Sequence, residues 1–267
     1  MKAFQNLRRK VGAMIGGVVG GFEGGLSARR LKTFAASRAH VNTLIQAAGA
    51  DMTARARYLI RNNGYAANAV ESWAGNAVGT GIKPSSGIAD AVLKDRVQRL
   101  WLRWTDESDA EGLTAFYGQP RRAARELFIA GEVFFRLRYR LPEDGLSVPL
   151  QLQMLPAEML PLNHNEALSN GNRVRQGIEF DRIGRHIAYH FLRRHPGDIT
   201  DPGLAGETVR VPAESVLHIV DPVDAGQLRG VSRFSPALVK LFLLDQYDDA
   251  ELDRKKVAAM FVGFVRR

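Results

Sequence analysis

The sequence contains no cysteine among its 267 residues, which excludes disulfide bonds and thiolate metal sites and fits a reducing compartment. It also has no run of about eighteen consecutive apolar residues, the length that a membrane-spanning helix needs, so no membrane partner is expected. The nearest candidate, residues 11–25, is crowded with glycine, and each glycine costs a helix about 1 kcal/mol. No small-residue cleavage site follows it. We therefore expect residues 1–25 to form a flexible, basic, glycine-rich arm.

A nucleotide-binding loop is absent as well. The stretch from Arg61 to Pro84 places Gly75, Gly79 and Gly81 ahead of Lys83. A phosphate-binding loop needs G-x-x-x-x-G-K-[ST], whose lysine is followed by a hydroxyl residue at the start of a helix. Here proline follows the lysine, so the glycines are better explained as helix ends, and no cofactor is expected.

Positive charge is in excess, and it is concentrated in the first part of the chain. The net charge is +9, and residues 1–61 alone hold eleven Lys and Arg against Glu23 and Asp51. Residues 141–267 hold fifteen basic and seventeen acidic residues. A basic arm on a nearly neutral body can meet nucleic acid, an acidic partner or only solvent. Its candidate contact residues are Arg8, Arg9, Lys10, Arg29 and Arg30.

The spacing of apolar residues predicts helices over residues 53–130. The first helix begins near Thr53 and ends at the Asn-Asn-Gly turn, and the second runs from about Tyr65 to Gly79. The third helix has one apolar stripe that includes Leu93 and Val97, and we expect its two tryptophans in the core. The fourth runs from about residue 114 to 130 and stops at Gly131.

After Gly131 the apolar period changes from 3.6 to 2, which predicts a β-rich segment over residues 131–220. Residues 132–140 and 150–154 alternate as two strands, and residues 175–194 form a hairpin that bends at 181–184. A loop and a last helix, which starts near Ser235-Pro236, occupy residues 221–267. The fold class is therefore α+β: helices first, central antiparallel strands and hairpins, then a long helix, in one body over residues 26–267.

Two histidines have a spacing that could bind a metal ion. His186 and His190 are four residues apart, but they fall in a predicted strand, which would separate them by about 13 Å. We therefore interpret them as half-exposed strand residues. His218, in an apolar strand, is expected to be a hydrogen-bonded core residue. No metal site is predicted.

An acidic cluster lies on the last helix. Its carboxylates could bind Mg²⁺, but basic residues three or four positions further on, Arg254 to Lys256, offer ordinary ion pairs instead. We interpret the cluster as a solvated or subunit-facing surface, and no catalytic residue is predicted. Its members are Asp245, Asp248, Asp249, Glu251 and Asp253.

Three segments together resemble one known family. They are residues 55–84 (RARYLIRNNGYAANAVESWAGNAVGTGIKP), residues 155–198 (LPAEMLPL to HPGD) and residues 216–265 (VLHIVDPVDAGQLRGVSRFSPALVKLFLLDQYDDAELDRKK and the apolar run after it). Their order and spacing are similar to those of the lambda-type family of tailed-phage portal proteins, over roughly residues 22–267. One departure is Gly64, where the family pattern suggests proline. Another is length, because the chain resembles the amino-terminal part of a longer portal protein.

The resemblance implies a structural protein without enzymatic activity. Portal subunits form a ring, usually of twelve copies, at one capsid vertex, located in the virion and in the host cytoplasm during assembly. The ring nucleates the procapsid, docks the terminase, contacts the major capsid and head-completion proteins, and lets double-stranded DNA through during packaging and ejection. ATP hydrolysis belongs to the terminase, which agrees with the missing phosphate loop.

A channel through which DNA slides must not grip phosphates, because each neutralised phosphate strengthens binding. We therefore expect the basic arm outside the ring or between subunits, and the acidic helix, residues 245–253, at the passage or against a neighbour. Two alternatives stay open. The chain could be a DNA-binding protein or metal-dependent nuclease that uses the arm and the strand arginines Arg136, Arg138 and Arg140. It could also be a defective prophage remnant that does not assemble.

Overall fold

The structure is a computed structural model that describes residues 33, 36–200 and 206–261. Within them, the helices and antiparallel sheets confirm the α+β class. The chain divides into two units, residues 1–40 and 41–267, and the second holds every element discussed below. No helix in the described ranges is long and apolar enough to cross a lipid bilayer. The α-helices are α2 (Val41–Asn62), α3 (Gly64–Val78), α4 (Ala91–Glu107), α5 (Gln119–Ala130) and α6 (Leu238–Met260).

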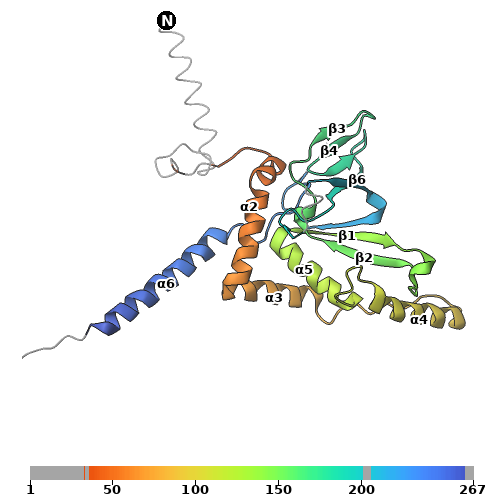
Figure 1. Ribbon diagram of the computed structural model, residues 1–267, viewed down its shortest axis with the longest axis horizontal. Helices are drawn as coiled ribbons and strands as arrows, with labels where there is room; N and C mark the ends of the chain where they lie inside the picture. Colours follow the sequence, from red (N-terminus) through yellow and green to blue (C-terminus); the bar gives the residue numbers. More distant parts are fainter. Residues whose placement is uncertain (1–32, 34–35, 201–205, 262–267) are drawn as a thin grey trace, which may run out of the picture. The chain divides into compact units, whose positions relative to one another are not determined.

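In the order of the chain, two separate sheets follow α2 to α5 and precede α6 (Figure 1). A three-stranded sheet has the order β2-β1-β8, and a five-stranded sheet has the order β3-β4-β5-β6-β7. The strands of the first are β1 (Glu132–Tyr139), β2 (Leu150–Leu155) and β8 (Val216–Val220). Those of the second are β3 (Glu166–Ala167), β4 (Arg173–Arg175), β5 (Ile178–Phe180), β6 (His186–Leu192) and β7 (Thr208–Pro212).

Helix α2 begins twelve residues before the predicted start at Thr53. The extra turns contain β-branched residues, Asn42 and Gly49, which are weak helix formers, so the local pattern is poor. Tertiary contacts compensate: Ile45 is buried, and Gly49 lies so close to Leu162 that an added Cβ would be 3.0 Å from its side chain. Packing against the body therefore overrides propensity here.

Gly79 and Gly81 follow the end of helix α3, as predicted, whereas Gly75 lies inside that helix. Helix α3 is capped at its start by the Asn63 side chain, which accepts a hydrogen bond from the Ala66 amide, and ends at Gly79, with positive φ. Helix α4 differs from its prediction. Trp104 is buried and its indole donates to the Leu150 carbonyl, but Leu93 and Val97 are 46% and 38% exposed. The apolar stripe of α4 is thus covered only at its carboxyl end.

Among the described residues the hydrophobic core has three parts. The largest lies between the two sheets and is centred on Phe134, which contacts the aromatic rings of Tyr189, Phe191 and His218. A second part joins α2, α3, α5 and the first turn of α6. A small third part lies between α5 and the outer face of β1 and β2. Figure 1 shows α5 leading directly into β1, so one segment takes part in all three.

Helix α6 starts three residues after Ser235, the predicted cap. Two tight turns precede it, and the hydroxyl of Ser232 accepts a hydrogen bond from the amide of Phe234. Because Phe234 is buried against Phe128, these turns fix where the helix leaves the body. The proline at 236 therefore lies in a turn and not in the first helical turn.

Candidate functional site

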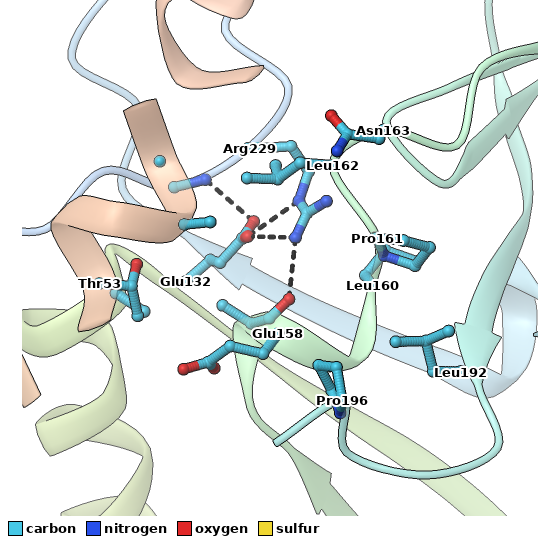
Figure 2. A pocket seen from close by; sticks show the side chains of 15 residues that line it. Thr53, Glu132, Glu158, Leu160, Pro161, Leu162, Asn163, Leu192, Pro196 and Arg229 are labelled. Carbon is cyan, nitrogen blue, oxygen red and sulfur yellow. Dashed lines mark hydrogen bonds and ion pairs between the residues drawn. The ribbon is translucent and has the colours of Figure 1, made fainter. Parts of the chain in front are cut away.

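A buried ion pair holds the segment that leads to α6. Arg229 is 1% exposed, and its guanidinium donates to Glu132 Oε1 and to the carbonyl oxygens of Gln176 and Ala157, at 2.8, 2.9 and 3.0 Å. Glu132 also accepts hydrogen bonds from the Gly230 amide at 2.9 Å and pairs with His218 Nε2 at 3.0 Å. Figure 2 shows Arg229 and Glu132 facing each other at the centre of this arrangement.

The charge on Glu132 is stabilised by its partners. Burial alone would raise the pKa of this carboxyl, but the positive charge of Arg229 and the hydrogen bonds from His218 and Arg229 outweigh it and lower the pKa to about 2. A buried charge with all its hydrogen-bonding capacity used is costly to disturb, because removing one partner leaves the other unpaired. The network therefore fixes β1, β8 and the loop before α6 to one another.

The same junction contains a close backbone crossing. Gly131 has φ of 79° and ends α5, and a Cβ added to it would lie 2.2 Å from the Val231 amide nitrogen. A Cβ on Gly230 would lie 2.3 Å from the carbonyl carbon of Gly131. Both positions require glycine, so the loop 221–237 can pass directly over the end of α5.

A second ion-pair cluster ties the helices to the sheets. Arg57 on α2 binds Glu126 on α5 and Glu158, with nitrogen–oxygen distances of 2.7 and 2.6 Å. Burial opposes the charge of Arg57, but the hydrogen bonds with both carboxylates outweigh it and raise its pKa. The arrangement is a structural clamp, since both carboxylates bind the one guanidinium group.

A cavity of about 250 Å³ lies beside the Arg229 network (Figure 2). Its walls are mainly aliphatic, with Leu160, Leu162 and Leu192 among them, and its charged groups, Glu132, Glu158 and Arg229, are paired. No group of three or more His, Asp or Glu side chains arranged to hold a metal ion occurs among the described residues. The cavity therefore offers an apolar packing space and no reactive group that is free to act.

Helix α6 leaves many of its apolar side chains exposed. Of its residues, all of which the structure describes, Leu238 alone is buried. Large apolar side chains around it remain 42–81% exposed, which is unusual for a helix of this length. They are Val239, Phe242, Leu243, Leu244, Tyr247, Leu252, Val257 and Met260.

The predicted acidic cluster is on this helix, and its members differ in their partners. Glu251 pairs with Arg254 and Asp253 with Lys256, as the spacing predicted. Asp245 accepts a hydrogen bond from the Asn63 side chain at 3.1 Å. Asp248 and Asp249 are exposed, and no hydrogen bond or ion pair joins their side chains to another described residue. A role in a subunit interface or channel stays a prediction.

The three candidate histidines, His186, His190 and His218, are strand residues, as predicted. His218 pairs with Glu132, and His190 pairs with Glu179 at 3.1 Å and stacks on His164. His186 packs against the ring of Phe180. Glu179, on the neighbouring strand, was missed as a partner because the pairing of β5 with β6 brings it there. The arm residues Arg8, Arg9, Lys10, Arg29 and Arg30 lie outside the described residues.

Comparison with known proteins decides the family. The family model described as "Phage portal protein, lambda family" matches residues 27–267. The chain belongs to this family. That result confirms the resemblance seen in the sequence. The match includes every described helix and strand, from α2 to α6.

Individual relatives carry the same name. The chain is 30% identical over 219 residues to the "Probable portal protein" of Halomonas phage phiHAP-1. It is 23% identical over 236 residues to "Portal protein B" of Escherichia phage lambda, and 25% over 237 residues to the "Portal protein" of Escherichia phage N15. Each match takes in 79% of this chain but 42% of the relative. The chain thus spans less than half the length of these portal proteins.

Proposed function

We propose that this chain provides the amino-terminal part of a portal subunit. Copies of it would associate in a ring, usually of twelve, at one capsid vertex, where double-stranded DNA passes during packaging and ejection. Terminase and the capsid and head-completion proteins would be its partners, and the virion its location. It would act through shape and self-association, without catalysis. Membership of the portal family supports this proposal.

The single structural observation that carries the proposal is the surface of α6. A 23-residue helix with one buried residue cannot gain much stability from its own body. Its exposed apolar side chains, such as Phe242, Leu244 and Tyr247, are the kind of surface that oligomer interfaces bury. A head-to-tail contact through such a helix closes into a ring when the rotation between copies allows it.

The experiment is to measure the assembly state of the purified chain by mass photometry and negative-stain imaging. We expect closed rings, and Leu252→Asp, on α6 where Leu252 is 54% exposed, should reduce them strongly. Ile183→Asp is the matched control, because Ile183 is 76% exposed in the bend between β5 and β6. A stable monomer at micromolar concentrations, with both variants behaving alike, would contradict the proposal.

The nuclease alternative has its own test. It requires Mg²⁺-dependent cleavage of DNA by the purified chain, lost when Asp248 and Asp249 are replaced by asparagine. We expect no cleavage above that of a mock purification from cells lacking the gene. Cleavage that copurifies with the chain and disappears in this variant would replace a structural role with an enzymatic one.

A further inference from the structure

Two arginines on β1 have no acidic partner in the part of the chain that the structure describes. Arg136 and Arg138 are two residues apart in the strand, so their side chains leave the same face about 7 Å apart. Both are half-buried, and no hydrogen bond or ion pair joins either to another residue of the described ranges. Burial and the neighbouring charge of Arg138 both lower the pKa of Arg136, as expected where like charges are held together without compensation.

Other basic groups nearby have a polar partner, either a carboxylate or, for Arg140, a neutral amide, which makes this pair distinct. Arg140 donates to the Gln151 side chain at 2.9 Å. Arg193 pairs with Glu207 at 3.2 Å, and Arg210 with Glu179 at 2.6 Å. Two half-buried guanidinium groups without a carboxylate among the described residues therefore offer a site for an anionic group.

The surroundings of the pair limit what that group can be. Grooves of about 330 and 280 Å³ lie beside the two arginines. The residues that line them are described ones and include no carboxylate; apolar side chains such as Phe191, Leu192 and Val209 form much of the second wall. Spaces of this size admit a few side chains. A DNA duplex is a broad polyanion that would contact projecting residues and leave such walls unfilled.

The complementary surface is on the same polypeptide. Asp248 and Asp249 on α6 are exposed acids that lack a partner among the described residues, and exposed Tyr247 and Leu252 lie beside them. Helix α6 itself packs on α2, through the buried cluster that contains Leu238 and Leu59. The two surfaces are complementary: the unpaired acids carry the opposite charge to the unpaired arginines, and both pairs have apolar side chains around them.

We propose that Asp248 and Asp249 of one copy bind Arg136 and Arg138 of the next copy, forming a head-to-tail contact between subunits. This inference rests on the proposed ring and names the residues that would close it. Because the two surfaces are different patches of the same chain, the contact is heterologous, the type from which rings are built. Bidentate arginine–carboxylate pairs would also set the orientation of each copy relative to its neighbour.

The test uses two charge-reversed variants of the full chain. One is Arg136→Glu with Arg138→Glu, and the other is Asp248→Arg with Asp249→Arg. Each alone should weaken self-association at least about tenfold, because like charges then face each other. A 1:1 mixture should recover assembly, since every contact in an alternating ring is then either the original pair or the reversed pair. Far-UV circular dichroism and thermal unfolding check that both variants fold.

The matched control is Arg173→Glu with Arg175→Glu, which reverses two exposed arginines of β4 at the same spacing. It should assemble like the wild type. Rings that form normally in either test variant would overturn the inference but leave the portal proposal standing. Loss of assembly that mixing does not recover would also overturn it. If the Arg136/Arg138 variant lost duplex-DNA binding while still assembling, the anion would be nucleic-acid phosphate. Absence of assembly in the wild type would contradict both proposals.

Discussion

Glu132 joins segments that are distant in the sequence, because its carboxylate binds Arg229, His218 and the Gly230 amide. Replacing it by glutamine keeps the shape but leaves the buried guanidinium without a counter-charge. We expect Glu132→Gln to lower the free energy of unfolding by about 3–5 kcal/mol, measured by chemical denaturation. Asp95→Asn is the control: it breaks an exposed i,i+4 pair with Arg99 and should cost less than about 1 kcal/mol. Equal losses of unfolding free energy in the two variants would show that the buried network stabilises the fold no more than an exposed ion pair does.

The same carboxyl predicts a pH dependence. Its pKa is about 2 in the folded chain, below the ordinary value of 4.5, so the folded state favours the ionised form. The resulting stabilisation is fully present above pH 4.5 and is lost as the pH falls to about 2, by about 3 kcal/mol in all. The difference in unfolding free energy between wild type and Glu132→Gln should therefore stay constant above pH 5 and shrink below 4.5. Parallel curves down to pH 2.5 would refute this assignment.

Gly131 gives a matched comparison of sterics with backbone strain. Gly131 and Gly145 both have positive φ, 79° and 74°, but an added Cβ at Gly131 meets the Val231 backbone at 2.2 Å while Gly145 has nothing within 4 Å. We expect Gly145→Ala to cost about 1–2 kcal/mol and Gly131→Ala to cost more than about 4, or to prevent folding. Soluble yield and denaturation midpoints measure both. Similar effects would mean that the chain crossing relaxes easily.

The roles of these residues could be predicted from the sequence to different degrees. His218 was predicted as a hydrogen-bonded core residue because it interrupts an apolar strand. Gly131 was predicted as a helix end, but its contact with Val231 was not. Arg229 gave no signal, since it follows an ordinary loop and its partner Glu132 is 97 positions away. The spacing of apolar residues predicts local helices and strands. It does not predict a buried ion pair between segments that are distant in the sequence.

At the scale of elements, the strands were the most predictable part. The alternation in β1 and β2 and the bend at Asp181, whose side chain accepts hydrogen bonds from the Ile183 and Arg185 amides, match their predictions. The short strands β3 and β4 were missed, because two or three residues carry no measurable period. The first turns of α2 were missed too, since only their packing in the folded chain makes them helical.

Helix α6 shows how an element can be well formed yet hardly attached. Leu238 is 7% exposed in the cluster with Leu59 and Phe234, whereas Leu252 is 54% exposed on the same helix. Leu238→Ala should therefore cost about 2–5 kcal/mol in the unfolding of the isolated subunit, and Leu252→Ala less than about 0.5. Denaturation below the concentration at which copies associate measures this. A large loss at Leu252 would mean that α6 packs on its own body more closely than described.

At the scale of the whole molecule, charge is separated along the chain. Residues 1–40 contain eight basic residues and one acid, which accounts for +7 of the net +9. The body that carries both sheets and all the described helices is therefore close to neutral. In the proposed ring, assembly would multiply whatever charge faces the bore, so the placement of the arm would decide whether DNA slides or is retained.

This separation leads to a prediction about the assembled ring. If the arm lies outside the bore or between subunits, replacing Arg8, Arg9, Lys10, Arg29 and Arg30 by glutamine should leave the affinity of closed rings for duplex DNA within about threefold. The salt dependence of binding should also stay the same. Fluorescence anisotropy across a salt series measures both, and the Arg173→Gln, Arg175→Gln variant controls for a general loss of positive charge. If the arm lined the bore, the variant would lose phosphate contacts. Each lost contact would make the slope of log affinity against log salt shallower by about 0.9. A marked flattening in the arm variant alone would place these residues on the DNA path.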